Sequence, residues 1–379
     1  MDLEKLRTEI DKVDNQIAEL YVKRMELSRE VGITKELQRI PLENTLREKE
    51  IISRVTATMP DEIKLYGKQV YETLFSTSKA YQSRLVNSTS ETKTMVEKAL
   101  KNGLVSFPIN CSVACQGVPG AYSQQAVEKM VEIPNTMFMK DWDSVFNAVE
   151  KGLCKFGVLP IENSSVGSVD TVYDLISKHN CYIVRCAKIR IQHYLLAKKG
   201  TKLEDIKEIF SHEQAIGQCS IFLKKIPNVK ITVVNNTAVA AKTVMESDRT
   251  DVACICSREC AGIYGLSVVE PNIHDNENNY TRFIAIAKQL EIYEGANKIS
   301  ITVNLAHEPG SLNKMLNRFS TLGLNLTKLE SRPIGSSQFE FNFYFDFDAD
   351  ITRPEVQNLV AELDNTCDRF VFLGAYQEI

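Results

Sequence analysis

The stretch LEKLRTEIDKVDNQIAELYVKRMELSREVGITKELQ, residues Leu3 to Gln38, decides the architecture of the first part of the chain. Its apolar side chains recur at alternating steps of three and four, which predicts one long helix with a coiled-coil-like seam. Such a helix is long for a globular protein, so we expect the seam to pack on another chain. The seam consists of Leu3, Leu6, Ile10, Val13, Ile17, Leu20, Arg24, Leu27 and Val31.

Arg24 places a positive charge in the middle of this apolar seam. A buried cation must find an anion or be expelled into water. Lys35, eleven residues further on, is rotated by only about 20° from Arg24 and lies about 16 Å along the helix axis. The two cations can therefore hold the two ends of a small dianion. The alternative is that Arg24 pairs with a glutamate across a helix interface.

Two shorter helices should follow. Pro41 prevents extension of the first helix, a second should begin near Asn44, and a third should run over residues 61–85. On the third, Ser78 and Gln82 are four residues apart and share a face. Ser78 interrupts an apolar stripe, although a helix serine often bonds back to a carbonyl of its own helix. The polar positions of the three helices are Arg7, Arg24, Lys35, Arg47, Glu48, Ser78 and Gln82.

This polar set resembles the site of the all-helical chorismate mutases, over roughly residues 1–88. The resemblance implies that Arg7, Arg24 and Arg47 bind the two carboxylates of chorismate and that Ser78 adds a carboxylate contact. The rearrangement to prephenate involves no proton transfer. It needs a flexible dianion held in its reactive shape, without a base, nucleophile or metal.

The resemblance also implies which groups assist bond breaking. Lys35 and Gln82 match the catalytic pair at the ether oxygen, and Glu48 matches the ligand of the ring hydroxyl. A buried donor at an oxygen that gains charge is worth about 3–4 kcal/mol of barrier. Asn44 stands where some relatives carry Asp, which should change a secondary polar contact and leave the reaction type intact.

Helix length makes a further demand on this site. Arg7 lies about 42 Å from Lys35 along a straight helix, and no side chain closes that gap. If both contact one ligand, Arg7 must come from a second protomer. We therefore expect a dimer with interleaved long helices and two mixed active sites.

Composition limits the class of protein. A chain of 379 residues with a net charge of −4 has room for two or three domains and gives no electrostatic case for nucleic acid or anionic membranes as partners. We find no apolar signal core and no run of membrane-spanning length, so we expect a cytoplasmic protein. The expected divisions are 1–88, a linker with a short helix at 89–110, 111–291 and 297–379, the short helix running over 95–101 after a polar linker at 87–94.

The ten cysteines do not suggest a metal site. None forms a CxxC pair, and no histidine is spaced as a ligand near them. Cys254 and Cys256 lie in the apolar string VACIC, where buried free thiols are the default. We therefore expect no metal and no cofactor.

The middle segment alternates short apolar strands with helices, which predicts an α/β domain. Four strand-to-helix junctions carry small polar residues, CQGVPGAYSQQA, LPIENSSVGSVDTV, FSHEQAIGQ and VNNTAVAAKT. Helix N-termini present free N–H groups that favour anions, so four junctions suggest two lobes with an anion-binding cleft. The alternative is that these residues only cap helices. Neither GxGxxG nor GxxxxGK[ST] occurs, which argues against a nicotinamide-dependent enzyme and an ATPase.

Four strings in this segment look like the signatures of prephenate dehydratase. They are GVPGAYS at 117–123, LPIENSS at 159–165, Ser211-His212 with Gln214-Ala215, and NYTRF at 279–283. The resemblance implies two α/β lobes like those of a periplasmic solute-binding protein and conversion of prephenate to phenylpyruvate with loss of water and CO2. The candidate substrate-binding residues are Ser123, Glu162, Asn163, Ser164, His212, Gln214, Thr237, Thr281, Arg282 and Phe283.

The roles of these residues stay partly open. The resemblance assigns the catalytic hydroxyl to Thr281, which we interpret as a hydrogen-bond donor to the departing oxygen. Glu162 or His212 can supply the proton instead, although His212 can equally be a histidine of the cleft wall. Arg282 can neutralise a substrate carboxylate or form a surface ion pair. Asn163 and Ser164 have loop closure as their alternative role.

The C-terminal segment predicts a ferredoxin-like order βαββαβ. Phenylalanines at 339, 341, 343, 345 and 347 alternate with polar residues or tyrosine, which indicates a half-buried antiparallel strand. The sheet should have one open face that favours pairing with another copy.

Two motifs here, HEPGSL at 307–312 and ESRP at 330–333, resemble the ACT regulatory domain of phenylalanine-sensitive dehydratases. The resemblance implies that L-phenylalanine binds at a dimer interface and inhibits by shifting the population of states. The simpler role of Gly310 is to permit a tight turn. The candidate effector-binding residues are Pro309, Gly310, Ser311, Leu312, Glu330, Ser331 and Arg332.

Taken together, the motifs predict a multidomain enzyme that rearranges chorismate to prephenate and then forms phenylpyruvate, under feedback by phenylalanine. One rival hypothesis is a solute-binding or sensor protein, because two α/β lobes also suit binding without turnover. Another keeps the dehydratase and reduces the helices to a dimerisation module. Channelling of prephenate, the choice between dimer and tetramer, and the strength of inhibition stay open.

Overall fold

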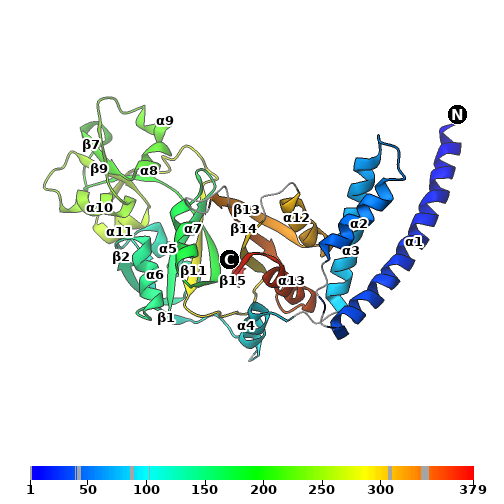
Figure 1. Cartoon of the computed structure of the whole chain (residues 1–379). Helices are drawn as coiled ribbons and strands as arrows, with labels where there is room; N and C mark the ends of the chain where they lie inside the picture. Colours follow the sequence, from blue (N-terminus) through cyan, green and yellow to red (C-terminus); the bar gives the residue numbers. More distant parts are fainter. Residues whose placement is uncertain are drawn as a thin grey trace. The chain divides into compact units, whose positions relative to one another are not determined.

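The computed structural model describes residues 2–38, 40, 44–85, 89–101, 103–305, 310–333 and 341–379. The chain divides into two units (Figure 1). The first unit comprises Met1–Lys101 with Lys298–Phe372, and the second comprises Asn102–Asn297 with Leu373–Ile379. Segments that are far apart in the sequence therefore share a unit.

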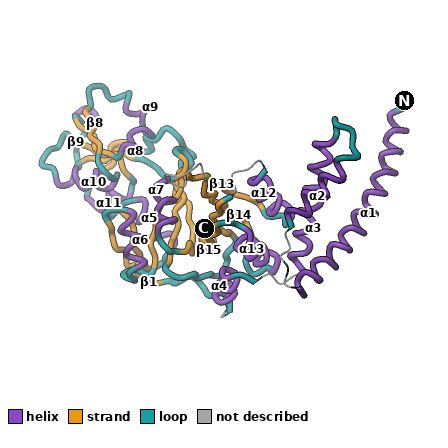
Figure 2. The backbone as a smooth tube through the Cα atoms, viewed as in Figure 1, coloured by secondary structure: helices purple, strands orange, loops and turns teal. Residues whose placement is uncertain are grey.

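The N-terminal part of the first unit is helical, as predicted. The Asn44 side chain accepts a hydrogen bond from the Arg47 amide at 3.0 Å, which fixes the start of the second helix. Figure 2 shows the N-terminal half of α1 standing clear of α2 and α3. The helices are α1 (Leu3–Gln38), α2 (Thr45–Thr56), α3 (Lys64–Leu85) and α4 (Glu91–Leu100).

The prediction that the short helix begins at residue 95 is wrong. Ser90 caps α4, because its side chain accepts from the Lys93 amide at 3.1 Å, and the helix starts at Glu91. The third helix likewise begins at Lys64, three residues later than expected. The polar first turn of α4 hides its start from a search for apolar periodicity.

The C-terminal part of the first unit has the predicted order βαββαβ. Strand β14 lies between β12 and β13 and is antiparallel to both. The last strand begins in this unit and its end belongs to the second. The elements are β12 (Lys298–Asn304), α12 (Ser311–Thr321), β13 (Asn325–Pro333), β14 (Phe341–Asp348), α13 (Pro354–Thr366) and β15 (Arg369–Glu378).

Strand β14 is not half-buried along its whole length. Phe345 and Phe347 are fully buried on one face of the strand. Tyr344 and Asp346 are buried on the other face. Asp346 accepts a hydrogen bond from the Ser300 hydroxyl at 2.5 Å, which satisfies the buried carboxylate. The expected open face is therefore wrong for this end of the strand, because period-two alternation cannot tell a polar residue in water from one buried with a partner.

Helix α4 packs against α13 within the first unit. The buried Lys93 ammonium donates to Asn358 Oδ1 at 2.8 Å, and the Thr92 amide donates to Asp364 Oδ2 at 3.0 Å. The Asn365 side chain donates back to the Thr89 carbonyl at 3.0 Å. These contacts fasten the segment that follows α3 to the βαββαβ domain.

The second unit has two α/β lobes, as predicted. The first lobe is a sheet in the order β5-β11-β3-β1-β2. Its strands β1, β2 and β3 are parallel, and β11 runs antiparallel to β3 and β5. The elements of this lobe are β1 (Asn110–Gln116), α5 (Tyr122–Met130), β2 (Ile133–Met139), α6 (Trp142–Glu150), β3 (Phe156–Asn163), β4 (Gly167–Ser168), α7 (Asp170–Lys178), β5 (Tyr182–Arg190) and β11 (Tyr280–Ala287).

The second lobe is a five-stranded sheet in the order β10-β6-β9-β7-β8, and the chain crosses between the lobes at 191–193 and again at 271–279. Its central strand β9 contains Cys254 and Cys256, which are buried free thiols as predicted. The elements are β6 (Tyr194–Ala197), η1 (Leu203–Asp205), β7 (Glu208–Ser211), α8 (Glu213–Gly217), α9 (Ser220–Leu223), β8 (Lys230–Val233), α10 (Thr237–Glu246), β9 (Val252–Cys256), α11 (Glu259–Tyr264) and β10 (Ser267–Glu270).

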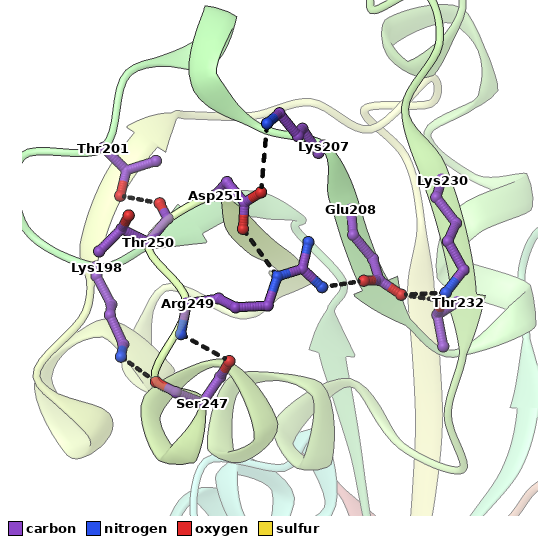
Figure 3. Close-up of polar contacts among 10 residues, drawn as sticks. All are labelled: Lys198, Thr201, Lys207, Glu208, Lys230, Thr232, Ser247, Arg249, Thr250 and Asp251. Carbon is purple, nitrogen blue, oxygen red and sulfur yellow. Dashed lines mark hydrogen bonds and ion pairs between the residues drawn. The ribbon is translucent and has the colours of Figure 1, made fainter.

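A charged network closes one end of the second lobe (Figure 3). Glu208 on β7 accepts from Lys230 at 2.8 Å, from Thr232 at 2.7 Å and from Arg249 at 2.5 Å. These partners, Lys230 first, lower the pKa of Glu208 to about 2. Because the donors satisfy the carboxylate from three sides, we interpret the network as structural.

Candidate active sites

The first site lies between α1 and α3. Arg24 donates to the Leu74 carbonyl at 3.1 Å and to the Ser78 hydroxyl, and its guanidinium lies 5.6 Å from the centre of the Phe75 ring. These partners on α3 are uncharged, so they orient the guanidinium without neutralising it. Within the described residues, these contacts of Arg24 do not include the glutamate partner of the alternative hypothesis.

Gln82 lies one turn beyond Ser78 on the same face of α3, as predicted. Its amide nitrogen donates to both the carbonyl and the hydroxyl of Ser28 at 2.8 Å. A Cβ added at Gly32 would lie 3.0 Å from Gln82 Cγ, so the absence of a side chain at Gly32 leaves room for the Gln82 side chain against α1. Neither Ser28 nor Gly32 could be predicted from the sequence pattern. Contact with the ether oxygen of a substrate would require the Gln82 amide to exchange this partner.

Glu48 on α2 is also part of this cluster. It forms an ion pair with Lys79 at 3.1 Å, and both side chains are about three-quarters buried. Lys79 was missed because a lysine next to Ser78 looks like an ordinary solvated residue. Lys35 lies half-buried near the end of α1. Arg47 instead pairs with Glu50 at 3.0 Å on the exposed face of α2.

Arg7 is not brought to the other site residues of this chain. It pairs with Glu4 at 2.9 Å in an exposed position near the start of α1. The apolar seam around it is exposed as well, from Leu3 and Ile10 to Leu20, which is 66 % accessible. An uncovered apolar stripe of this length indicates a surface that binds a partner.

The second site begins at the edge of the first lobe. Thr281, the second residue of β11, is buried, and its Oγ1 accepts from Asn163 Nδ2 at 2.9 Å. The same Asn163 nitrogen lies 2.8 Å from Asn279 Oδ1, and Asn163 Oδ1 accepts from the amides of Ser165 and Val166. Because Asn163 supplies the hydrogen in its bond to Thr281, the hydroxyl hydrogen of Thr281 can point elsewhere.

Ser164 closes the loop after β3. Its hydroxyl donates to the Asn278 carbonyl at 3.0 Å and accepts from the Tyr280 amide at 2.9 Å. These bonds tie the end of β3 to the segment that crosses back from the second lobe. For Ser164 the structure therefore favours the loop-closing alternative.

Arg282 and Phe283 follow Thr281 on β11, and both are buried. The buried Arg282 forms an ion pair with Glu162 at 3.0 Å. It alternates with Thr281 along β11 and so lies on the opposite face of the sheet. Phe283 is 3 % accessible and belongs to the apolar core of the first lobe. Substrate binding by these two residues stays a prediction, because a motif in a strand includes residues from both faces.

Four predicted residues lie at helix N-termini. Ser123 is buried in the first turn of α5, and Thr237 is the first residue of α10 after its cap Asn236. His212 caps α8, with Nδ1 accepting from the Gln214 amide at 3.3 Å, and the Gln214 side chain is exposed. Burial lowers the pKa of His212, so its imidazole is neutral at pH 7 and is a weak proton source.

The candidate effector residues lie on two elements of the βαββαβ domain. Gly310 has φ of +90° and precedes α12, whose first residues are Ser311 and Leu312. The residues from Glu330 to Arg332 end β13. Pro309 lies outside the described residues. Among the described residues, the buried Ser311 hydroxyl has no hydrogen-bond partner.

Known proteins match both parts of the chain. A family model of type II chorismate mutase matches residues 6–83, and one of prephenate dehydratase matches residues 113–291. Arogenate dehydratase/prephenate dehydratase 2 of Arabidopsis thaliana is 38 % identical over 276 residues, which are 70 % of this chain and 72 % of the relative. The chain belongs to the prephenate dehydratase family.

Two further relatives cover the chain differently. The bifunctional chorismate mutase/prephenate dehydratase of Escherichia coli is 28 % identical over 377 residues, 98 % of this chain and 95 % of the relative. The crystal structure of an Arthrobacter aurescens prephenate dehydratase with L-Phe has a TM-score of 0.64 and 29 % identity, covering 70 % of this chain and 90 % of that one. The chain thus joins a chorismate mutase domain to a prephenate dehydratase domain.

No described helix is both long and apolar enough to cross a membrane. No three His, Cys, Asp or Glu side chains within the described ranges are grouped closely enough to hold a metal ion.

Proposed function

We propose that this chain is a bifunctional enzyme of phenylalanine biosynthesis that rearranges chorismate to prephenate and converts prephenate to phenylpyruvate. The observation that carries the second step is the hydrogen bond from Asn163 to Thr281 at 2.9 Å. It fixes a buried hydroxyl at a strand end where the family motif and the lobe edge coincide.

The first reaction needs only shape and charge. Arg24 is held by α3 without being neutralised, so it can bind one carboxylate of chorismate. Lys35 supplies a second cation on the same helix face, at the oxygen that gains charge as the C–O bond breaks. Glu48 can accept a hydrogen bond from the ring hydroxyl, and its ion pair with Lys79 holds it in place.

A second copy of the chain completes this site. The exposed seam of α1 offers a partner helix an apolar stripe that has the spacing of a coiled coil. An antiparallel partner would bring its own Arg7 toward Arg24 and Lys35. The proposal is a homodimer through the N-terminal helices, with two mixed mutase sites.

The second reaction leaves an aromatic ring. The bond from the ring to its carboxylate breaks, the electron pair enters the ring, and the ring C–O bond breaks with loss of hydroxide. Hydroxide takes a proton and leaves as water, while the carboxylate leaves as CO2. Thr281 donates a hydrogen bond to the departing oxygen, and Asn163 holds the threonine in the required rotamer.

The substrate of the second reaction needs its own test, because several relatives are named arogenate dehydratases. The mutase domain on the same chain produces prephenate, which favours prephenate here. Rates measured with prephenate and with arogenate at equal concentration decide between them. A higher kcat/KM for arogenate would overturn this assignment.

We further propose that the βαββαβ domain is an ACT domain that binds L-phenylalanine. The buried Ser311 hydroxyl, unpartnered among the described residues, lies in the first turn of α12, where helix N–H groups favour a carboxylate. Calorimetric titration with phenylalanine should show binding that Ser311→Val weakens at least fivefold. A heat signal equal for both proteins would remove Ser311 from the site.

A threonine replacement tests the dehydratase assignment. Thr281→Val keeps the shape and removes the donor, so the dehydratase rate should fall about 100- to 1000-fold while the mutase rate stays unchanged. Thr302→Val, at another buried strand threonine, is the matched control and should retain both activities. A Thr281→Val protein with the wild-type dehydratase rate would exclude this role.

A further inference from the structure

The loop from Gly117 to Ala121, between β1 and α5 of the first lobe, lies against the second lobe. Tyr264 of α11 donates its hydroxyl hydrogen to the Pro119 carbonyl at 2.7 Å, and Ser257 donates to the Gly120 carbonyl at 3.1 Å. Ala121 is fully buried in the apolar core of the second lobe. The loop therefore belongs to one lobe by sequence and to the other by packing.

Two glycines permit this close approach. Gly117 has φ of +118° and Gly120 has φ of +88°, a region that side chains disfavour. A Cβ added at Gly120 would lie 2.8 Å from Cys260 Sγ, and one added at Gly117 would lie 3.2 Å from Asn236 Nδ2. Cys260 and Asn236 are residues of the second lobe, so both glycines are needed where the loop meets it.

Tyr122, the next residue, fastens the loop to the segments that join the lobes. Its hydroxyl donates to the Gln192 carbonyl at 2.5 Å, in the first crossing, and its ring lies edge-on to His193 at 6.0 Å. The His193 ring bonds Gln218 of the second lobe at 2.8 Å. The His193 carbonyl accepts from the Ile273 amide at 2.9 Å, in the second crossing.

His193 can play this part because it is neutral. Burial lowers its pKa to about 4, so at pH 7 the ring carries one hydrogen. With Nε2 as the donor to the Gln218 oxygen, Nδ1 faces the Tyr122 hydroxyl at 3.5 Å. Every contact of this cluster joins segments from different parts of the two lobes.

We propose that Tyr122 and Tyr264 are positioning residues of the dehydratase. They fasten the loop from Gly117 to Ala121, called the interlobe loop from here on, to both lobes, and so hold the two lobes at the separation that the substrate requires. This inference rests on the proposed dehydratase function. The interlobe loop keeps Thr281 and Asn163 of the first lobe in a fixed position relative to the residues of the second lobe before substrate binds. Such preorganisation avoids the free-energy cost of ordering the lobes on binding.

The proposal predicts a particular kinetic signature. If the lobes separate more often, only a fraction of the enzyme is competent to bind, and the apparent dissociation constant rises by the inverse of that fraction. Saturating substrate restores the competent state, so kcat is preserved. A residue that only supported folding would lower the amount of active enzyme, and hence kcat, with KM unchanged.

Removal of single hydroxyl groups tests this signature in the full-length chain. Tyr264→Phe and Tyr122→Phe should each raise KM for prephenate about 2- to 10-fold, with kcat within twofold of wild type. The mutase rate of the same protein reports the amount of folded chain. Unchanged KM values in both variants, or a fall in kcat alone, would overturn the proposal.

A pair of glycines provides the matched control. Gly120→Ala adds a methyl group that Cys260 opposes, whereas Gly200→Ala, at φ of +91°, meets no atom within 4 Å. Both replacements cause backbone strain, so both should lower stability, but Gly120→Ala alone should raise KM, by at least tenfold. An equal rise in KM for Gly200→Ala would assign the effect to general strain.

Hydrogen exchange tests the role of the interlobe loop separately from the proposed dehydratase function. In Tyr264→Phe, the amides of Gly117, Ala121 and Ile273 should exchange at least threefold faster than in the wild type. Faster exchange in a protein that does not act on prephenate would support the contacts of the interlobe loop and overturn the dehydratase function. Normal exchange at these amides together with normal dehydratase activity would overturn the role of the interlobe loop and leave the dehydratase function intact.

Discussion

At the scale of single residues, buried charges and hydroxyl groups mark the functional places of this molecule. Arg24 interrupts an apolar seam, and its contacts with α3 are to uncharged groups. Thr281 is buried with its oxygen occupied by Asn163. In both cases uncharged neighbours hold the polar group in place.

Glu208 shows the contrasting case of a charge that serves stability. Its low pKa of about 2 means that the folded protein favours the ionised form. The stabilisation is therefore present above the ordinary pKa near 4.5 and is lost as the pH falls toward 2. Glu208→Gln should cost about 1–2 kcal/mol at pH 7, a modest value because Lys230 and Arg249 remain largely in water.

Denaturant unfolding of the wild type and of Glu208→Gln between pH 7 and pH 3 measures this effect. The two curves should converge as the pH falls below 4.5. A difference that stays constant over the whole range would mean that Glu208 contributes through packing and not through its charge.

Sequence reasoning worked best for residues whose type conflicts with their surroundings. Arg24 could be singled out because it interrupts an apolar stripe, whereas Ser78, which does the same, also donates to the Leu74 carbonyl of its own helix at 2.6 Å, as its alternative role predicts. The roles of Arg282 and Phe283 could not be settled from the motif, because adjacent strand residues face opposite sides and the motif does not say which side holds the substrate. Ser28 and Gly32 carry no signal, since their role depends on the side chain of Gln82 from another helix.

At the scale of elements, α1 carries the proposed dimer interface. Ile17 on the seam and Val22 off the seam are both 58 % accessible in the single chain. Ile17→Glu should weaken the dimer at least tenfold and lower the mutase rate, because Arg7 of the partner is lost from the site. Val22→Glu should change neither.

Analytical ultracentrifugation measures the dimer and a chorismate assay measures the rate. The dehydratase should be unaffected in both variants. An Ile17→Glu protein that dimerises normally and retains full mutase activity would contradict the proposed mixed site.

Helix α4 supports a second prediction at this scale. Lys93→Met keeps the apolar stem and loses the bond to Asn358, so the first unit should lose about 1–2 kcal/mol of stability. Lys98→Met, on the exposed side of the same helix, is the control and should be neutral in urea unfolding. Equal stability of both variants would show that the contact between α4 and α13 does not depend on this bond.

At the scale of the whole molecule, the order βαββαβ and the two lobes could be predicted from alternating patterns and spacing. The grouping of residues 1–101 with 298–372 could not, because it depends on contacts such as that between Lys93 and Asn358, which are far apart in the sequence. The pairing of Gln377 with Arg185, which extends β15 to Glu378, is another contact between residues far apart in the sequence.

The most direct measurement follows chorismate and each later product through three versions of the chain. The wild type should form phenylpyruvate. Arg24→Ala should leave chorismate unused but convert added prephenate, and Thr281→Val should consume chorismate and accumulate prephenate. If either folded variant lost both activities, or if Arg24→Ala still consumed chorismate at the wild-type rate, two separate sites on one chain would be contradicted.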